Sequence, residues 1–132
     1  MGELTLRASG PVDPSRAWQR YAEPARWADW APHLRGVDYP LPRLRANTAG
    51  QVCGPWGLRV PFTVERCDEA SRTWSWTVHL RVREADVVTV ALAHGVVADE
   101  GGCATWLRLR GRWPVILGYA PIAQLALRRL VR

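Results

Sequence analysis

Apolar and polar residues alternate along most of the second half of the chain, a period of two that is typical of β-strands with one buried face. The longest run covers 72–83, where Trp74 and Trp76 share one face and Ser75 lies on the other. Similar runs predict strands at 3–8, 48–53, 58–66, 87–99 and 103–113, with a short strand at 36–39. Turns are predicted at 68–71, 84–86 and 99–102.

The apolar faces of these strands supply much of the expected core. They carry Phe62 in 58–66, Leu92 and His94 in 87–99, and Leu107 in 103–113. Pro61 has no N–H to donate, so we expect its strand to lie at a sheet edge or to contain a bulge at this proline. Arg59 lies on the face opposite Phe62, and only such a bulge would turn it inward.

Helical signals occupy the two ends of the chain. Asp13 and Pro14 begin a helix that runs to about 22, and a second short helix before Pro32 carries Trp27 and Trp30 on one face. A final amphipathic helix begins at 114, with Pro121 as a site where it could kink. Its apolar positions are Ile116, Tyr119, Ala123, Ala126, Leu127 and Leu130.

This order of elements predicts an α+β fold. Six or seven antiparallel strands form one curved sheet, and the only long amphipathic helix covers its concave face. A wedge-shaped space remains between them, and the two short helices close one end of it. The 132 residues fit a single domain spanning 1–132.

Composition narrows the function classes. The net charge is +6, but all 18 basic residues are arginines scattered along the chain, so we expect no nucleic-acid partner. The three cysteines form no C-x-x-C pair, and no signal peptide precedes the first strand, so we expect a cytoplasmic protein. No catalytic triad, P-loop or Rossmann glycine pattern occurs, and the three histidines lack metal-ligand spacing. We therefore expect neither a metal nor a cofactor.

Several short patterns resemble the START/Bet v 1-like (SRPBCC) superfamily, in its polyketide cyclase/dehydrase and lipid-transport branch. The resemblance covers about 3–131 and rests on Val12-Asp13, Ala17-Trp18, Glu23-Pro24, Trp27-x-x-Trp30-x-Pro32, Val37, Trp76, His94-x-Val96 and Gly102-x-x-Thr105. It implies a helix-grip fold with a hydrophobic cavity between the sheet and the C-terminal helix. Members of this family bind lipids, steroids or polyketides, and some cyclise or dehydrate poly-β-ketone chains. The C-terminal helix is shorter here, so we expect a smaller or more open cavity.

Candidate site residues follow from the predicted faces and from this resemblance. Flat apolar walls for a ligand are expected from Trp27, Trp30, Trp76, Phe62, Leu92, Leu107 and Ala123. Three polar groups could act in catalysis. His94 could be an acid/base or a donor to a ligand carbonyl, Tyr119 could offer its hydroxyl to a ligand, and Arg59 could hold an anionic or enolate oxygen. Each also has a purely structural interpretation: the tryptophans fill the core, and His94 is a hydrogen-bonded core residue. His33 is expected near the mouth of the cavity.

Three functions remain open. The first is binding of a hydrophobic, polyketide-like or polycyclic compound, with or without its aldol cyclisation and dehydration. The second is a non-catalytic carrier for a lipid or similar molecule. The third is a membrane-surface or partner-binding module, because the apolar run 115–127 is followed by Arg128 and Arg129. That run is too interrupted to span a bilayer, and a homodimer is left open.

Overall fold

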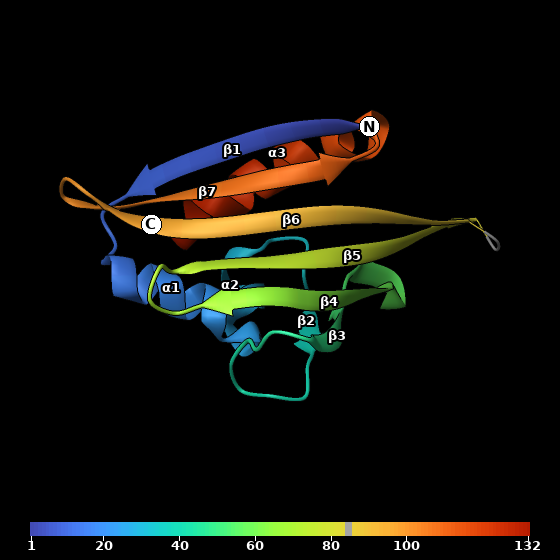
Figure 1. Ribbon diagram of the computed structural model, residues 1–132, viewed down its shortest axis with the longest axis horizontal. Helices are drawn as coiled ribbons and strands as arrows, with labels where there is room; N and C mark the ends of the chain where they lie inside the picture. Colours follow the sequence, from blue (N-terminus) through green and yellow to red (C-terminus); the bar gives the residue numbers. More distant parts are fainter. Residues whose placement is uncertain (84–85) are drawn as a thin grey trace.

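The chain folds into one antiparallel sheet with a long helix packed on one face (Figure 1). The computed structural model describes residues 1–83 and 86–132, so the first two positions of the turn predicted at 84–86 lie outside the described residues. The strands are β1 (Gly2–Gly10), β2 (Gly36–Asp38), β3 (Thr48–Cys53), β4 (Arg59–Asp68), β5 (Thr73–Arg83), β6 (Asp86–Asp99) and β7 (Gly102–Gly111). The helices are α1 (Pro14–Ala22), α2 (Trp27–Trp30) and α3 (Trp113–Leu130), with short 3-10 helices η1 (Pro24–Arg26) and η2 (Pro55–Gly57).

The sheet has seven strands in the order β1-β7-β6-β5-β4-β3-β2, and each neighbouring pair is antiparallel. Helix α3 packs against β1 and β7, α1 packs against β6 and β7, and α2 contacts both α3 and β2. Figure 1 shows α3 lying behind β1 and β7, with α1 and α2 grouped together below them. The predicted α+β helix-grip plan, with two short helical segments after the first strand, is confirmed.

The edge position predicted for the strand of Pro61 is wrong, and the bulge of this strand lies away from the proline. Strand β4 lies inside the sheet between β3 and β5, and the register shift in β4 falls between Val64 and Arg66 rather than at Pro61. Pro61 pairs with Gln51 of β3, whereas the register with β5 begins one residue later, at Phe62. The proline therefore occupies the end of the β5 ladder, where a missing N–H is tolerated.

Helix α1 begins as its sequence predicts and is anchored by a buried hydroxyl chain. The Asp13 carboxylate accepts the Ser15 backbone N–H over 2.8 Å, and Pro14 takes the first helical turn. At the other end of α1, the Tyr21 hydroxyl lies 2.6 Å from Thr105 Oγ1. The Thr105 hydroxyl in turn donates to the Gly95 carbonyl over 2.9 Å. Tyr21 is therefore the donor to Thr105, and these two hydrogen bonds connect α1 to β7 and β6.

Helix α3 continues through Pro121 without ending there. Its fully buried residues are Ile116, Ala123, Ala126, Leu127 and Leu130, as its spacing predicts. The Arg20 guanidinium of α1 donates to the Leu130 carbonyl, and Gln124 donates to the Arg7 carbonyl of β1 over 2.8 Å. These bonds fasten the C-terminal half of α3 to α1 and to β1.

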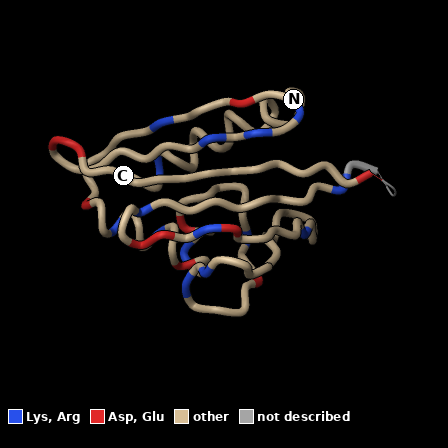
Figure 2. Tube along the Cα trace, viewed as in Figure 1, with Lys and Arg blue, Asp and Glu red and all other residues tan. Residues whose placement is uncertain are grey.

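Charged residues are spread over the sheet, the hairpins and the helices, with acidic positions beside basic ones (Figure 2). Within the part of the chain that the structure describes, no helix is both long and apolar enough to cross a lipid bilayer.

Candidate ligand cavity

An apolar cavity of about 260 Å³ lies between the inner face of the sheet, α2 and α3. Its lining comes from α2 and the residues after it, from the inward faces of β3 to β7, and from one side of α3. The lining residues are Trp27, Trp30, Ala31, His33, Leu34, Val52, Leu58, Val60, Trp74, Trp76, Val78, Leu80, Val90, Leu92, His94, Leu107, Val115, Ile116, Tyr119, Ala123, Ala126 and Leu127. Of the two short helices, α2 lines the cavity through Trp27 and Trp30, whereas no residue of α1 belongs to the lining.

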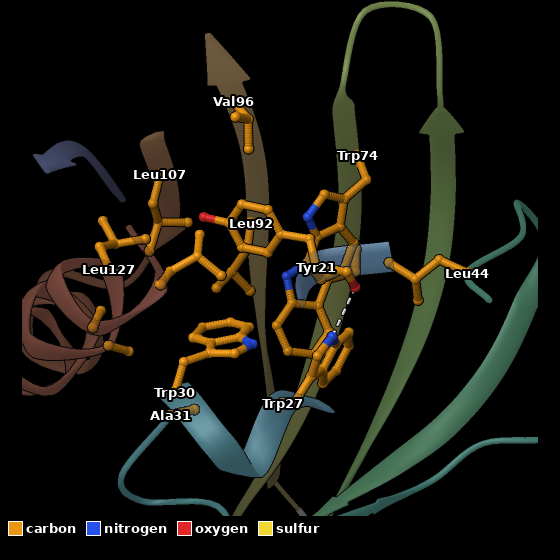
Figure 3. Packing of buried hydrophobic residues seen from close by; sticks show 14 of the residues in the cluster. Tyr21, Trp27, Trp30, Ala31, Leu44, Trp74, Leu92, Val96, Leu107 and Leu127 are labelled. Carbon is orange, nitrogen blue, oxygen red and sulfur yellow. Dashed lines mark hydrogen bonds between the residues drawn. The ribbon is translucent and has the colours of Figure 1, made fainter. Parts of the chain in front are cut away.

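Helix α2 presents its two tryptophans as apolar walls. The Trp27 indole N–H donates to the Tyr21 carbonyl over 2.8 Å, and the Trp30 indole N–H donates to the Arg20 carbonyl over 3.0 Å. Figure 3 shows Trp27 and Trp30 rising from α2 toward Tyr21 and Trp74. Because α1 accepts both indole N–H groups, these two tryptophans have no polar edge left for a ligand.

The structure brings most of the predicted binding residues into one lining: Trp27, Trp30, Trp76, Leu92, Leu107 and Ala123. Phe62 does not reach the cavity. Its ring lies behind those of Trp27 and Trp76, with ring centroids 5.6 and 5.2 Å away, and it is 1% exposed. Phe62 therefore packs behind the residues that line the cavity. The periodicity of β4 predicts only that Phe62 faces inward, not whether it lines the cavity or packs behind the lining.

His94 is held neutral in an aromatic environment. Its ring stacks on Trp74, with centroids 4.6 Å apart and planes 9° apart, and meets the edge of Tyr21 at 4.9 Å. The Trp76 indole N–H donates to His94 Nε2 over 3.0 Å. Burial lowers the pKa of His94 to about 3, because the imidazolium would lose its hydration. In this geometry His94 is a neutral hydrogen-bonding group, and its acid/base role stays a prediction.

Tyr119 and His33 meet across the cavity. The Tyr119 hydroxyl of α3 lies 3.4 Å from His33 Nε2, and the two rings meet edge to face at 5.6 Å. Burial raises the pKa of Tyr119 to about 12 and lowers the pKa of His33. Both groups are therefore neutral near pH 7, and their contact joins α3 to the segment after α2.

Arg59 lies away from the cavity. Its guanidinium is more than half exposed, 3.8 Å from Asp38 and 3.3 Å from the Gln51 side-chain oxygen. The bulge of β4 is not at Pro61, so the alternation of the strand continues through Pro61 and keeps Arg59 on the outer face. The structure therefore separates Arg59 from His94 and Tyr119.

Trp74 is a lining residue that the predicted binding residues did not include. It lies directly opposite His94 in the register of β5 and β6. Three lining residues have a buried side-chain nitrogen that lacks a hydrogen-bond partner among the described residues: His33 Nδ1, Trp74 Nε1 and His94 Nδ1. Alternation placed Trp74 on the inward face, but no sequence signal gave its partner across the strands. In the same described part, no three His, Cys, Asp or Glu side chains lie close enough to hold a metal ion.

Comparison with known proteins gives the fold but no named activity. No protein-family model and no curated protein sequence matches the chain. Among solved structures, Ara h 8.0201 superposes with a TM-score of 0.75 at 13% identity, over 98% of this chain and 94% of that one. The hypothetical protein jhp0584 from Helicobacter pylori gives 0.77 at 14% identity, over 98% and 84%.

A third similar structure is protein MLL2253 from Mesorhizobium loti, with a TM-score of 0.75 at 14% identity over 98% of this chain and 96% of that one. These identities are too low to transfer a ligand or a reaction, but the superpositions cover nearly whole chains. Together with the seven-stranded sheet and the helix gripped against it, they establish the architecture. The chain therefore has the Bet v 1-like helix-grip fold that its sequence resembles.

Proposed function

We propose that this protein binds a small, hydrophobic, ring-containing molecule, polycyclic or polyketide-like, in the cavity between the sheet and α3. The observation that carries the proposal is the lining itself: about 260 Å³ of apolar space walled by aromatic rings. Flat aromatic walls favour a flat ligand, since offset and edge-to-face ring contacts add to the gain from burial. The pocket is preformed, as small-molecule sites usually are.

The cavity size limits the ligand. An apolar cavity of roughly 150 Å³ accommodates benzene, so the 260 Å³ found here matches a compound of about two fused rings. Larger tetracyclic ligands would need the α2 segment to move outward.

Binding is supported better than catalysis. A cyclase or dehydrase needs a group that exchanges protons near pH 7, and His94 is neutral with its Nε2 already accepting from Trp76. Aldol cyclisation and dehydration would then rest on hydrogen-bond donation to a developing oxyanion. A non-catalytic carrier of a hydrophobic metabolite requires none of this and is the simpler form of the proposal.

The proposal takes 1–132 as one ligand-binding domain in a reducing cytoplasm. Its support is one buried core that runs from α1 to α3. The cysteines Cys53, Cys67 and Cys103 are all free. Neither feature requires a second domain or an oxidising compartment.

Filling the cavity tests the proposal. Ala123→Leu adds bulk at a lining position on α3, whereas Ala49→Leu adds the same bulk at an exposed position on β3. Naphthalene should quench the tryptophan fluorescence of the native chain and of Ala49→Leu, and bind Ala123→Leu at least about tenfold more weakly. The melting temperature of each variant, measured alongside, shows whether the fold is kept. Equal binding to all three proteins, or none to any, would overturn the proposal.

A second candidate function is adsorption to an anionic membrane surface, favoured by the outer side of α3. Its exposed apolar residues are Trp113, Leu117, Ile122 and Leu125, and Arg128 and Arg129 follow in the last turn. Co-sedimentation with phosphatidylglycerol vesicles that weakens with salt, and is lost in a Leu117→Ser/Leu125→Ser double variant, would support it. Binding that is absent, or equal on neutral vesicles, would exclude it.

A further inference from the structure

A second pocket of the molecule is basic rather than apolar. It encloses about 500 Å³ at the surface, where α1, η1 and α2 meet the C-terminal end of α3. Its lining residues are Arg20, Arg26, Asp29, Trp30, Arg129 and Arg132. Four arginines that are far apart in the sequence therefore border one space, which we call the arginine pocket.

A neighbouring polar pocket extends this basic surface along α1. It encloses about 520 Å³ and is lined by Ser15, Arg16, Gln19, Arg20 and Arg26. Arg20 and Arg26 belong to both linings, so the two pockets are continuous. Together they add Arg16 to the four arginines of the arginine pocket.

Arg20 is the fixed member of this group. Its Nη1 donates to the Leu130 carbonyl and, over 3.2 Å, to the Arg132 backbone oxygen. A guanidinium has five N–H donors, and these two bonds occupy only those of Nη1. In the described part of the chain, Arg20 Nη2 and Nε have no acceptor, and neither atom is fully buried. Three positioned N–H donors are thus accessible to a ligand.

The chain itself leaves most of this charge uncompensated. Arg26 pairs with Glu23 over 3.2 Å. Among residues 1–83 and 86–132, no side-chain carboxylate forms an ion pair with Arg129 or Arg132. Asp29 is the one carboxylate in the lining, and within the same residues it pairs with no arginine. A concave surface lined mainly by one sign of charge concentrates ions of the opposite sign.

The geometry of the arginines narrows the class of anion. Guanidinium groups bind phosphate oxygens in pairs, through two parallel N–H bonds. The arginines reach the pocket from α1, η1 and the end of α3, and a phosphate group presents oxygens in several directions, whereas a carboxylate presents both along one edge. A volume of about 500 Å³ leaves room for more than one phosphate group.

We propose that the arginine pocket binds an anion with two linked phosphate groups, which Arg20 positions and which Arg129 and Arg132 neutralise. The pocket lies outside the apolar cavity, and Trp30 is the one described residue that lines both. The inference therefore goes beyond the proposed function and does not depend on it.

Calorimetry with sodium pyrophosphate at low ionic strength tests the proposal. Arg129→Gln/Arg132→Gln removes two arginines of the pocket, whereas Arg7→Gln/Arg66→Gln removes two exposed arginines of β1 and β4 outside it. Both variants have the same net charge. The first should bind at least about tenfold more weakly than the native chain, and the second within about twofold of it. Equal weakening, or no binding to the native chain, would overturn the proposal.

A second variant should bind more tightly, which loss of folding cannot imitate. Asp29→Asn removes the carboxylate from the lining, so its affinity for pyrophosphate should rise about three- to tenfold. An unchanged or lower affinity would overturn the assignment of the anion to this pocket. Citrate, which is also a multiply charged anion, should bind the native chain more weakly. Citrate binding as tight as that of pyrophosphate would overturn the phosphate class.

A linked pair of phosphates belongs to inorganic pyrophosphate and also to organic diphosphates such as ADP. Titration of the native chain with each compound distinguishes these two sources. Tighter binding of ADP would support the proposal with an organic carrier, and tighter binding of pyrophosphate would support it with the inorganic ion. The melting temperature should rise with the tighter compound more than with sodium chloride at the same ionic strength. An equal rise would overturn specific binding.

Discussion

Trp76 of β5 donates its indole N–H to His94 of β6 across a diagonal of the sheet, with 3.0 Å between the two nitrogens. This bond and the surrounding rings keep the imidazole uncharged, because burial opposes protonation and Nε2 is already an acceptor. His94 is thereby an uncharged acceptor for Trp76 in a hydrophobic wall.

The depressed pKa of His94 predicts a pH dependence of stability. Its pKa is about 3 in the folded chain against an ordinary value of 6.5, so between these values the unfolded chain binds more protons. The free energy of unfolding should therefore fall as the pH drops below about 6.5, by at most about 1.4 kcal/mol per pH unit from this group. Urea denaturation at pH 7, 6 and 5 measures the slope.

Carboxylates also titrate in this range, so the test compares variants. His94→Gln keeps an acceptor for Trp76 but cannot be protonated, and its stability should fall less steeply with acid than that of the native chain. His79→Gln, on the outer face of β5 beside Thr63, should retain the native slope. Parallel slopes for all three proteins would show that His94 is not buried as described.

The buried hydrogen bonds from Tyr21 to Thr105 and from Thr105 to Gly95 predict how much stability the Tyr21 hydroxyl contributes. Tyr21→Phe removes the donor to Thr105 and leaves the ring contacts with Trp30 and Trp74 in place. The loss of a buried hydrogen bond should cost about 1–2 kcal/mol in the free energy of unfolding. Chemical denaturation checks this against Tyr39→Phe. The Tyr39 hydroxyl contacts Thr48 and accepts the Arg45 backbone N–H near solvent, so water can replace these contacts and the loss should be smaller. A larger loss for Tyr39→Phe would contradict the assignment.

Close packing of β1 against the end of α3 predicts intolerance of a side chain at Gly10. A Cβ on this residue would lie 2.1 Å from the Val131 carbonyl oxygen, so the C-terminal end must shift. Gly10→Ala should lower the free energy of unfolding by about 2 kcal/mol or more. Gly36→Ala is the control, because nothing lies within 4 Å of its Cβ. Melting temperatures that agree for the two variants would refute the contact.

The alternation of apolar residues determined which face of each strand is buried, because side chains in a strand point to opposite sides in turn. The same reasoning placed Trp27 and Trp30 together, since residues three apart share a helix face. Proline and aspartate near 13–14 determined where α1 begins. These are local rules, and they were sufficient for the α+β plan of a curved sheet covered by the C-terminal helix.

The strand register, and which inward-facing residues line the cavity, were decided only by the tertiary structure. Whether Trp74 or Trp76 lies opposite His94 depends on how β5 and β6 align, which their periodicities leave free. Phe62 and Trp76 are both inward-facing, yet one supports the wall and the other lines it. Pro61 tolerates an interior strand because the β5 ladder ends beside it. The residues next to a position in the sequence determine which face of the strand or helix it occupies. The residues that it contacts on that face belong to segments far away in the sequence, so only the tertiary structure determines them.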